Sequence, residues 1–445
     1  MTTNIDLKAT QNSYYAASAN EQPQYPTLHA DIEVDVCVVG GGFAGLSAAI
    51  ELTDKGYKVA VLEANHIGFG ASGRNGGQLI AGLACEQDVI ENALGFDAAK
   101  QVWNMTLEAL DLVRERVKRF DIKCDLVDGF LGVSVGAKKG KSLRKWYDNM
   151  ATKYGYDSDA KWIEPAYLKD WINSPRYFNG YFDKRSGHVH PLNYCLGLAK
   201  GAASLGVHIF QHSAVTSMQQ GETNLLKTET GSVKAKFVVL AGNIFLSEIS
   251  PQLAPSLSKR IMPVGTYIIG TEPIEPNLVK QLIPSNSAVC DTCFALDYFR
   301  FSGGANNQTQ ATSPRMIFGG RVSYSTMTPR HLTQSMQQRM VDAFPQLKNT
   351  KVEYTWGGYV DISMNRAPDF GRIAPNIYYL QGFSGHGVAL TGMAGKLVAE
   401  AITGQATRFD IFAKIKHHDF FGGKLLRTPA LILGMAWYQL REKLG

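Results

Sequence analysis

The chain has 445 residues, of which 45% are hydrophobic and 19% charged, and its formal net charge is +6. A chain this long predicts two domains, because single hydrophobic cores seldom grow beyond about 250 to 300 residues. The small positive charge gives no support to a nucleic-acid-binding protein, and the chain lacks the apolar run of about 18 residues that predicts a transmembrane helix. Six cysteines are too few for a disulfide framework, and the first residues lack a signal-peptide pattern, so a cytoplasmic protein is expected.

A glycine-rich turn opens the informative part of the sequence. Residues 36–39 predict a strand, residues 44–52 predict a helix, and between them Gly40, Gly42 and Gly45 form a GxGxxG pattern. Glycines let the backbone approach phosphate oxygens, and the start of the helix directs free N–H groups at them. The turn therefore predicts a pyrophosphate site.

Glu63 adds a second sign of dinucleotide binding. It ends the predicted strand of residues 59–62, about 20 residues after the glycines, where a carboxylate accepts hydrogen bonds from ribose hydroxyls. An acid at this position favours an adenosine with a free 2′-hydroxyl. Residues 68–77, GFGASGRNGG, then form another glycine-rich segment, whose small residues would let the backbone approach a flat ring system.

The next elements predict a second domain inserted into the nucleotide-binding unit. Residues 88–120 have the apolar pattern of one helix, residues 124–135 suggest paired strands around Gly129, and residues 138–154 suggest another helix. Pro191 then starts a helix that runs to residue 203. A strand over residues 207–215 and a hairpin follow, and the buried strand of residues 235–242 matches a third parallel strand.

In the second half of the chain, apolar and polar residues alternate in a way that is typical of an antiparallel sheet. Its three β-rich runs cover residues 261–269, 294–301 and 316–324, and a helix is expected from Pro329 to residue 343, capped by Thr328. A strand over residues 377–381 then breaks at the turn GFSGHG (382–387), and a helix runs over residues 388–402. If that helix start meets the pyrimidine end of a flavin, its dipole stabilises the negative charge of the reduced ring.

These motifs resemble those of the D-amino-acid oxidase, glycine oxidase and sarcosine oxidase superfamily of FAD enzymes. Within it, the sequence is most similar to the bacterial γ-glutamylputrescine oxidoreductases. The segments that carry the resemblance span almost the whole chain. They are SYYAASAN (13–20), IGFGASGRNGGQ (67–78), GHVHPLN (187–193), VLAGN (239–243), FPQLK (344–348) and NIYYLQGFSGHGV (376–388).

The resemblance implies an α/β fold, α+β overall: a Rossmann-like FAD-binding domain built from discontinuous segments, with an inserted substrate domain that contains an antiparallel sheet. The expected parts are an N-terminal tail (1–30), the FAD-binding domain (31–90, 183–245 and 355–410), the substrate domain (91–182 and 246–354) and a C-terminal helical segment (411–445). In that last segment, residues 428–440 are expected to form a helix packed on the body rather than a membrane contact.

The resemblance also implies which residues bind FAD. These are Gly40, Gly42, Ala44 and Gly45 at the pyrophosphate with Phe43 beside them, Glu63 and Ala64 at the ribose, Ala71, Ser72, Gly73, Arg74, Asn75, Gly76, Gly77 and Gln78 along the pyrophosphate and isoalloxazine, Val215 at the adenine, Ala241 and Gly242 after the third strand, and Gly385, His386, Gly387 and Val388 at the pyrimidine edge.

Two departures from the superfamily narrow the expected chemistry. Sarcosine oxidases place a lysine shortly after the GHG turn to bind a carboxylate next to the reacting amine, whereas this chain has Val388, Ala389 and Leu390. A substrate without that carboxylate fits better. The cysteine or histidine that bonds flavin covalently in some relatives is also missing, so non-covalent FAD is expected.

The implied activity is oxidation of the terminal primary amine of γ-glutamylputrescine to an aldehyde, with oxygen or another acceptor reoxidising FAD. Alternatives are another amine substrate, such as a free polyamine or a secondary amine, and an assembly or regulatory protein with little turnover. His386 is the candidate catalytic residue, and Trp356 and Tyr298 are candidate substrate contacts. His188 and His190 are interpreted as structural, with no metal site expected. Four arginines are open candidates for the glutamyl end: Arg74, Arg300, Arg321 and Arg366.

Overall fold

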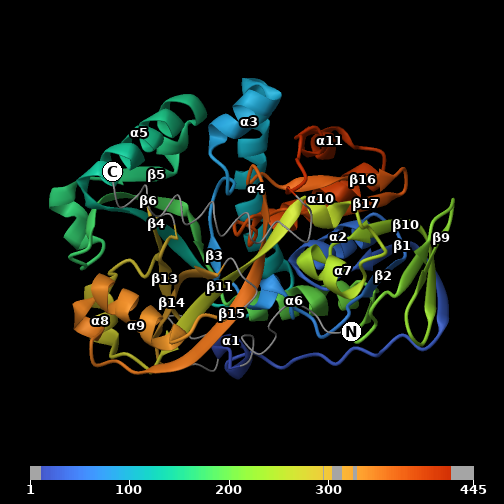
Figure 1. Cartoon of the computed structure of the whole chain (residues 1–445), viewed down its shortest axis with the longest axis horizontal. Helices are drawn as coiled ribbons and strands as arrows, with labels where there is room; N and C mark the ends of the chain where they lie inside the picture. The colour runs from blue at the N-terminus through green and yellow to red at the C-terminus, as the bar shows by residue number, and fades with distance from the viewer. Residues whose placement is uncertain (1–11, 294, 303–312, 324–327, 422–445) are drawn as a thin grey trace.

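The computed structural model describes residues 12–421, except residues 294, 303–312 and 324–327. Its strands form two sheets that lie next to one another, with β1, β2 and β10 in one and β4, β6 and β14 in the other (Figure 1). In the part of the chain that is described, no helix combines the length and the apolar character needed to cross a membrane. The predicted helix at residues 428–440 lies outside the described residues.

The first sheet is the predicted nucleotide-binding sheet, and its order is β16-β17-β10-β1-β2-β7. β17, β10, β1, β2 and β7 are parallel, so the expected third parallel strand is confirmed. The strand expected over residues 207–215 is much shorter. The members of this sheet are β1 (Asp31–Val39), β2 (Val59–Leu62), β7 (His208–Phe210), the hairpin β8 (Ser217–Gln219) and β9 (Asn224–Lys227), β10 (Ser232–Leu240), β16 (Asp369–Ala374) and β17 (Ile377–Gln381).

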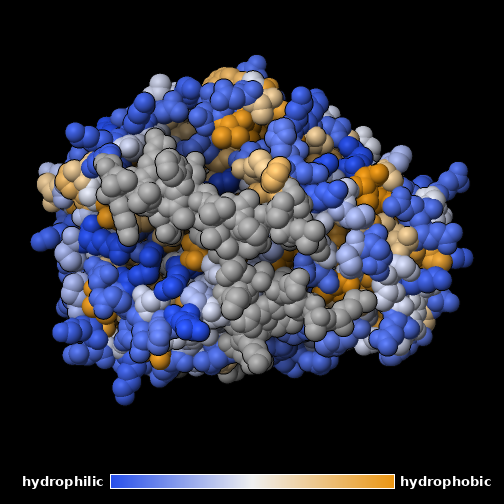
Figure 2. Space-filling model, viewed as in Figure 1, coloured by the Kyte–Doolittle hydropathy of each residue, from blue (hydrophilic) through white to orange (hydrophobic). Residues whose placement is uncertain are grey.

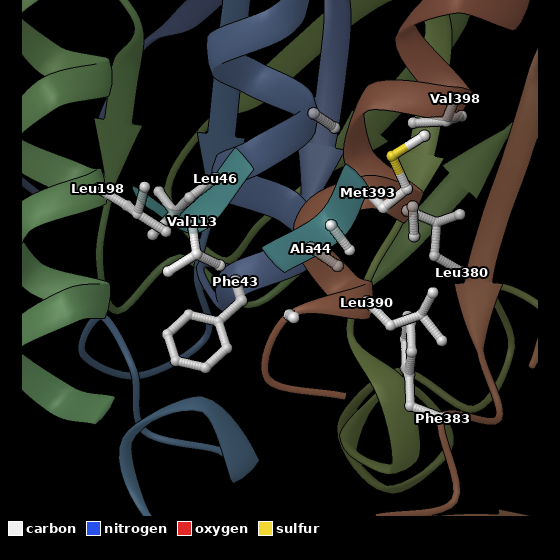
Figure 3. Close-up of a cluster of buried hydrophobic side chains, with 14 of the residues drawn as sticks. Phe43, Ala44, Leu46, Val113, Leu198, Leu380, Phe383, Leu390, Met393 and Val398 are labelled. Carbon is white, nitrogen blue, oxygen red and sulfur yellow. The ribbon is translucent and has the colours of Figure 1, made fainter. Parts of the chain in front are cut away.

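Helices pack on this sheet and fix the start of α2 (Phe43–Asp54) at its edge. α2 lies between α6 (Pro191–Ser204) and α10 (Leu390–Ile402), and α4 (Phe96–Arg119) contacts both of these neighbours. Figure 3 shows side chains from all four helices meeting in one buried cluster, among them Leu46, Val113, Leu198 and Met393. Their burial holds the α2 N-terminus in place. The remaining helices near this sheet are α1 (Tyr14–Ala17), α7 (Asn243–Ile249) and α11 (Thr407–Ala413).

The second sheet is almost entirely antiparallel, as expected, with the order β15-β11-β14-β13-β12-β4-β6-β3 and β5 beside β6. Only β12 and β4 run parallel among its described strands. Its strands are β3 (Gln78–Leu79), β4 (Val127–Val135), β5 (Ala160–Ile163), β6 (Tyr177–His188), β11 (Ile261–Thr271), β12 (Ala288–Asp291), β13 (Tyr298–Ser302), β14 (Arg315–Ser323) and β15 (Val352–Ser363). Its helices are α5 (Gly136–Tyr154), α8 (Pro276–Leu282) and α9 (Leu332–Ala343).

Three local predictions are wrong. The helix expected over residues 88–120 is two helices, α3 (Gln87–Leu94) and α4, because Gly95 between them has a φ of +84° that a helix interior does not allow. The paired strands expected around Gly129 are the single strand β4, in which Gly129 lies at an irregularity of the pairing with β6. The helix expected from Pro329 begins at Leu332, after the left-handed residue His331.

The N-terminal segment, predicted to be a tail, is packed against the body of the protein. Tyr15 of α1 is fully buried, and its ring meets those of Trp356 and His190 with centroids 5.2 and 4.9 Å apart. Elsewhere hydrophilic residues predominate on the visible face of the molecule (Figure 2). The domain boundaries given above stay a prediction.

Candidate active site

A pocket with an empty volume of about 1270 Å³ runs along the carboxyl ends of the parallel strands. It begins at Val39 of β1, Leu62 of β2 and Ala241 after β10, and it reaches Val360 of β15 in the second sheet. Open parallel sheets bind their ligands at this edge. The pocket therefore lies between the nucleotide-binding sheet and the antiparallel sheet.

The GxGxxG turn forms one wall of the pocket, and its glycines are required by close contacts. Gly40 has a φ of +114°, and a Cβ there would lie 2.7 Å from the carbonyl oxygen of Ala241. A Cβ on Gly45 would lie 2.0 Å from the Gly40 carbonyl, so Gly45 packs the helix against the turn and does not itself line the pocket. Gly42, Phe43 and Ala44 line it.

The start of α2 is arranged to receive an anion. Ser72 Oγ accepts a hydrogen bond from Phe43 N at 3.0 Å, which ties the second glycine-rich segment to this helix. The next N–H groups of a helix have no partner within the helix, and its positive dipole end favours a negative charge. A pyrophosphate placed beside Gly42 and Ser72 would meet these free N–H groups and the positive end of the helix dipole.

Glu63 is held in the pocket by two backbone donors. Its Oε2 accepts from Gly41 N at 2.7 Å, and its Oε1 accepts from Asn65 N at 2.9 Å. Burial raises the pKa of Glu63, and these N–H groups oppose the rise. Since each carboxylate oxygen can accept a further hydrogen bond, the group is oriented for two ribose hydroxyls. Ala64 lines the pocket beside it.

The second glycine-rich segment borders the pocket, and Asn75 ties it together. Asn75 Nδ2 donates to the carbonyls of Ala71 (2.9 Å) and Ser72 (3.0 Å), and its Oδ1 accepts from Gly77 N at 2.8 Å. Ala71 and Ser72 belong to the short 3-10 helix η2 (Ala71–Gly73). Three of the predicted residues, Ala71, Ser72 and Asn75, line the pocket. The others lie outside its lining: Gly73, Arg74, Gly76, Gly77 and Gln78.

The adenosine end contains a helix that sequence reasoning missed. Val215, Ala241 and Gly242 line the pocket as predicted, but so do Ile244 and Phe245 of α7. The Val215 carbonyl accepts from Ser250 Oγ at 2.5 Å, just after α7. The signal in the sequence was the short apolar stretch directly after the third parallel strand.

The late turn at residues 382–387 closes the other end of the pocket. Gly385, Gly387 and Val388 line it. Asp361 of β15, which sequence reasoning also missed, holds this turn because its Oδ2 accepts from Phe383 N at 3.1 Å and from Gly382 N. Burial raises the pKa of Asp361 to about 6, and these backbone donors oppose the rise.

The candidate catalytic residue His386, also a predicted FAD contact, and the candidate substrate contacts Trp356 and Tyr298 lie outside the lining of the pocket. The His386 ring is partly buried, with Nε2 3.2 Å from the Ile80 carbonyl, and burial lowers its pKa, which favours the neutral ring. Trp356 is 1% exposed and donates to the Arg74 carbonyl at 3.1 Å. Tyr298 packs on Gly319. Their roles in substrate binding stay predictions.

Two buried histidines near this region have structural partners. His188 Nε2 lies 2.8 Å from the Asn286 carbonyl, and His190 Nδ1 accepts from Asn193 N at the start of α6. Burial and the charge of Arg300 lower the pKa of each to about 3, so both rings are neutral at physiological pH. In the described part of the chain, no three His, Cys, Asp or Glu side chains are grouped to hold a metal ion.

Comparison with known proteins identifies the fold and the cofactor. The family model described as FAD dependent oxidoreductase matches residues 35–401. The chain belongs to this FAD-dependent oxidoreductase family. The pocket agrees with that cofactor, because it joins a ribose-binding carboxylate, a helix N-terminus and a glycine turn along one continuous wall.

Two curated members of the FAD-dependent oxidoreductase family match over nearly the whole chain. The chain is 41% identical to the Gamma-glutamylputrescine oxidoreductase of Escherichia coli (strain K12), over 98% of this chain and 99% of the relative. It is 39% identical to the Probable oxidoreductase OrdL of Haemophilus influenzae, over 97% of both chains.

Solved structures confirm the fold. The L-proline dehydrogenase of P. horikoshii superposes with a TM-score of 0.70 at 21% identity, covering 86% of this chain and 98% of that one. The glycine oxidase of Geobacillus kaustophilus gives 0.68 at 19% identity, covering 83% and 95%. At these identities the likeness concerns the fold alone.

Proposed function

We propose that this enzyme oxidises the terminal primary amine of γ-glutamylputrescine in putrescine degradation. The products are the aldehyde and ammonia, and reoxidation of the cofactor by molecular oxygen gives hydrogen peroxide. The observation that carries the proposal is the 41% identity to the Escherichia coli enzyme over 98% of this chain. At that coverage, both the cofactor site and the region around it have counterparts in the relative.

The end of the pocket at α10 supports an amine without a neighbouring carboxylate. Val388 lines the pocket, and Ala389 and Leu390 behind it are each 3% exposed. An amino-acid carboxylate placed here would lose a charge-assisted hydrogen bond, which contributes about 1.5–3 kcal/mol. An amine on an unsubstituted carbon loses nothing at this position.

FAD, when bound, supplies the two-electron acceptor for the amine. The chain's own residues bind it, orient it and exclude water. We infer that the α2 N-terminus and Ser72 hold the pyrophosphate, that Glu63 holds the ribose, and that the turn fixed by Asp361 meets the pyrimidine edge. Apolar walls such as Phe383 and Val388 keep the reacting end dry, which favours the neutral amine.

We further propose that the parallel sheet carries FAD and the antiparallel sheet covers the substrate side. Non-covalent FAD fits a pocket whose described lining includes neither cysteine nor histidine. A cytoplasmic location fits six cysteines that are all free.

The test is product analysis with separate substrates. Purified enzyme is given γ-glutamylputrescine, putrescine, spermidine or sarcosine in air, and aldehyde, ammonia and hydrogen peroxide are measured. Equal amounts of the three products from γ-glutamylputrescine, with much less from the other amines, are expected. A preference for spermidine or putrescine would overturn the proposed substrate but not the FAD-dependent amine oxidation. Ammonia without hydrogen peroxide would indicate an electron acceptor other than oxygen.

A further inference from the structure

The substrate of the proposed function has a second charged end, which the pocket for FAD does not explain. Far from the reacting amine, γ-glutamylputrescine carries an α-carboxylate and an α-ammonium on one carbon. Resting on the proposed function, we propose that Arg366 binds that carboxylate and Glu86 binds that ammonium, on two segments that flank the 382–387 turn. The pair would select the glutamylated amine over free polyamines.

Arg366 stands on a fixed turn that is joined to the cofactor turn. Arg366 N donates to the Ser363 carbonyl at 3.0 Å, and the residue has a φ of +59°. Ser363 N in turn donates to Ser384 Oγ at 3.2 Å, inside the turn that closes the pocket. The turn that carries Arg366 is therefore hydrogen-bonded to the 382–387 turn, whose Gly385 and Gly387 line the pocket.

The guanidinium of Arg366 is available, unlike those of the other three candidates. Arg366 is exposed, and within the described residues its side chain has no hydrogen bond or ion pair. Arg300 is 1% exposed and engaged by backbone and by Tyr15, and Arg321 Nη1 donates to Ser335 Oγ at 2.6 Å. Arg74 donates to the Phe69 carbonyl at 2.5 Å and stacks on that ring. A planar guanidinium with free donors is the preferred partner of a carboxylate.

Glu86 is anchored on the other side of the same turn. His386 Nε2 lies 3.2 Å from the Ile80 carbonyl, which ties the segment before α3 to residues 382–387. Glu86 ends that segment, directly before α3, and is exposed. Desolvation and the charge of Asp88 raise the pKa of Glu86, and the charge of Arg366 opposes the rise.

The two charges interact without forming an ion pair. Among the described residues no ion pair joins Arg366 to Glu86, and the charge of Arg366 also contributes to the lowered pKa of His386. A zwitterion with opposite charges on one carbon fits such a separated pair better than a singly charged end does. Free putrescine and spermidine offer no carboxylate to Arg366.

Two substrate analogues remove one charge each and give a sharp test. Glutarylputrescine lacks the α-ammonium, and 4-aminobutanoylputrescine lacks the α-carboxylate. Steady-state KM and kcat are measured for these and for γ-glutamylputrescine with the wild type, Arg366→Gln, Arg366→Lys and Glu86→Gln. Asp97→Asn, which removes an exposed acid in the first turn of α4, is the matched control.

Arg366→Gln is expected to raise KM roughly 10- to 100-fold for the two substrates that carry the carboxylate, relative to 4-aminobutanoylputrescine. Glu86→Gln is expected to raise KM for the two substrates that carry the ammonium, relative to glutarylputrescine. Arg366→Lys is expected to recover part of the loss, and kcat at saturation is expected to change little in all variants. Asp97→Asn is expected to leave these ratios as in the wild type.

Equal changes for all three substrates, or no change, would overturn the subsite while the wild-type turnover of γ-glutamylputrescine still supports the proposed function. A wild type that oxidises none of the three but oxidises another amine would overturn both proposals. Flavin absorbance of each purified variant shows that it is folded and loaded, so a lost protein is not mistaken for a lost contact.

Discussion

Arg300 of β13 donates from Nε to the carbonyl of Gly76 at 2.8 Å, which joins the antiparallel sheet to the second glycine-rich segment. The same guanidinium donates to Phe301 O and to the hydroxyl of Tyr15, at 3.3 and 3.2 Å. No carboxylate lies within 4.0 Å of Arg300 among the described residues, although its side chain is 1% exposed. The guanidinium of Arg300 holds the backbone at Gly76 in place. Because its acceptors are all neutral, burying its charge carries a substantial desolvation cost.

Arg300→Met should therefore weaken FAD binding. The change leaves the buried Gly76 carbonyl without its donor, and an unsatisfied group of this kind costs about 1–3 kcal/mol. We expect the Kd for FAD to rise roughly 10- to 100-fold, measured by quenching of flavin fluorescence in titrations of the FAD-free protein. Arg315→Met is the control, because Arg315 stacks on the neighbouring Tyr14, whereas it is Arg300 that donates to the Gly76 carbonyl. Equal losses in both variants would contradict a specific role for Arg300.

Glu63→Gln should weaken FAD binding through the ribose. The amide keeps one acceptor oxygen but replaces the other, which now accepts from Gly41 N, with a donor. We expect the Kd for FAD to rise about tenfold or more in the same titration. Glu33 is exposed on β1, so the control variant Glu33→Gln should bind FAD like the wild type. Unchanged affinity in Glu63→Gln would contradict the assignment of Glu63 to the ribose.

Asp361 should make the FAD-free protein less stable as the pH rises. Its folded pKa of about 6 lies above the ordinary carboxyl value, so the folded state binds the proton more tightly than the unfolded state does. Its contribution to the free energy of unfolding is therefore greatest in acid and falls as the pH rises through about 6. Relative to that of Asp361→Asn, we expect the free energy of unfolding of the wild type to fall by about 1–2 kcal/mol between about pH 5 and 7, measured by urea unfolding. A constant or increasing difference would show that the carboxylate is not penalised by burial.

Gly45→Ala should disrupt the start of α2. The added Cβ would lie 2.0 Å from the Gly40 carbonyl oxygen, so either the helix or the turn must move. Overpacking of this kind costs about 1–3 kcal/mol or more, and we expect a lower Tm together with loss of flavin absorbance. Gly270→Ala in β11 is the control, since its Cβ would meet the nearest atom at an ordinary 3.4 Å. A flavin-loaded, equally stable Gly45→Ala protein would contradict this packing.

Features that depend on local sequence could be predicted, and features that depend on distant partners could not. The turn at Gly40 and the carboxylate of Glu63 follow from spacing within one βαβ unit. β15 was missed because its strand pattern is interrupted by Gly357 and Gly358 and it is stabilised by pairing with β11, far away in the sequence. Asp361 was missed for the same reason, since its partners are the N–H groups of a turn about 20 residues later.

The N-terminal segment shows the same limit. It was predicted to be a tail, because nothing within its sequence reveals a partner. The burial of Tyr15 depends on Arg300 of β13 and Trp356 of β15, which both lie far from Tyr15 in the sequence. The available signal was the motif SYYAASAN (13–20), which was interpreted only as part of the family resemblance.

The most direct test of the central claim is reduction of the bound flavin by γ-glutamylputrescine without oxygen. The purified enzyme is mixed anaerobically with γ-glutamylputrescine, putrescine, spermidine or sarcosine, and the visible flavin band is followed. We expect rapid and complete bleaching with γ-glutamylputrescine and slow or incomplete bleaching with the others. Fast bleaching by a different amine, with γ-glutamylputrescine inert, would contradict the proposed substrate, and the absence of a flavin band after addition of FAD would contradict the assignment of the pocket.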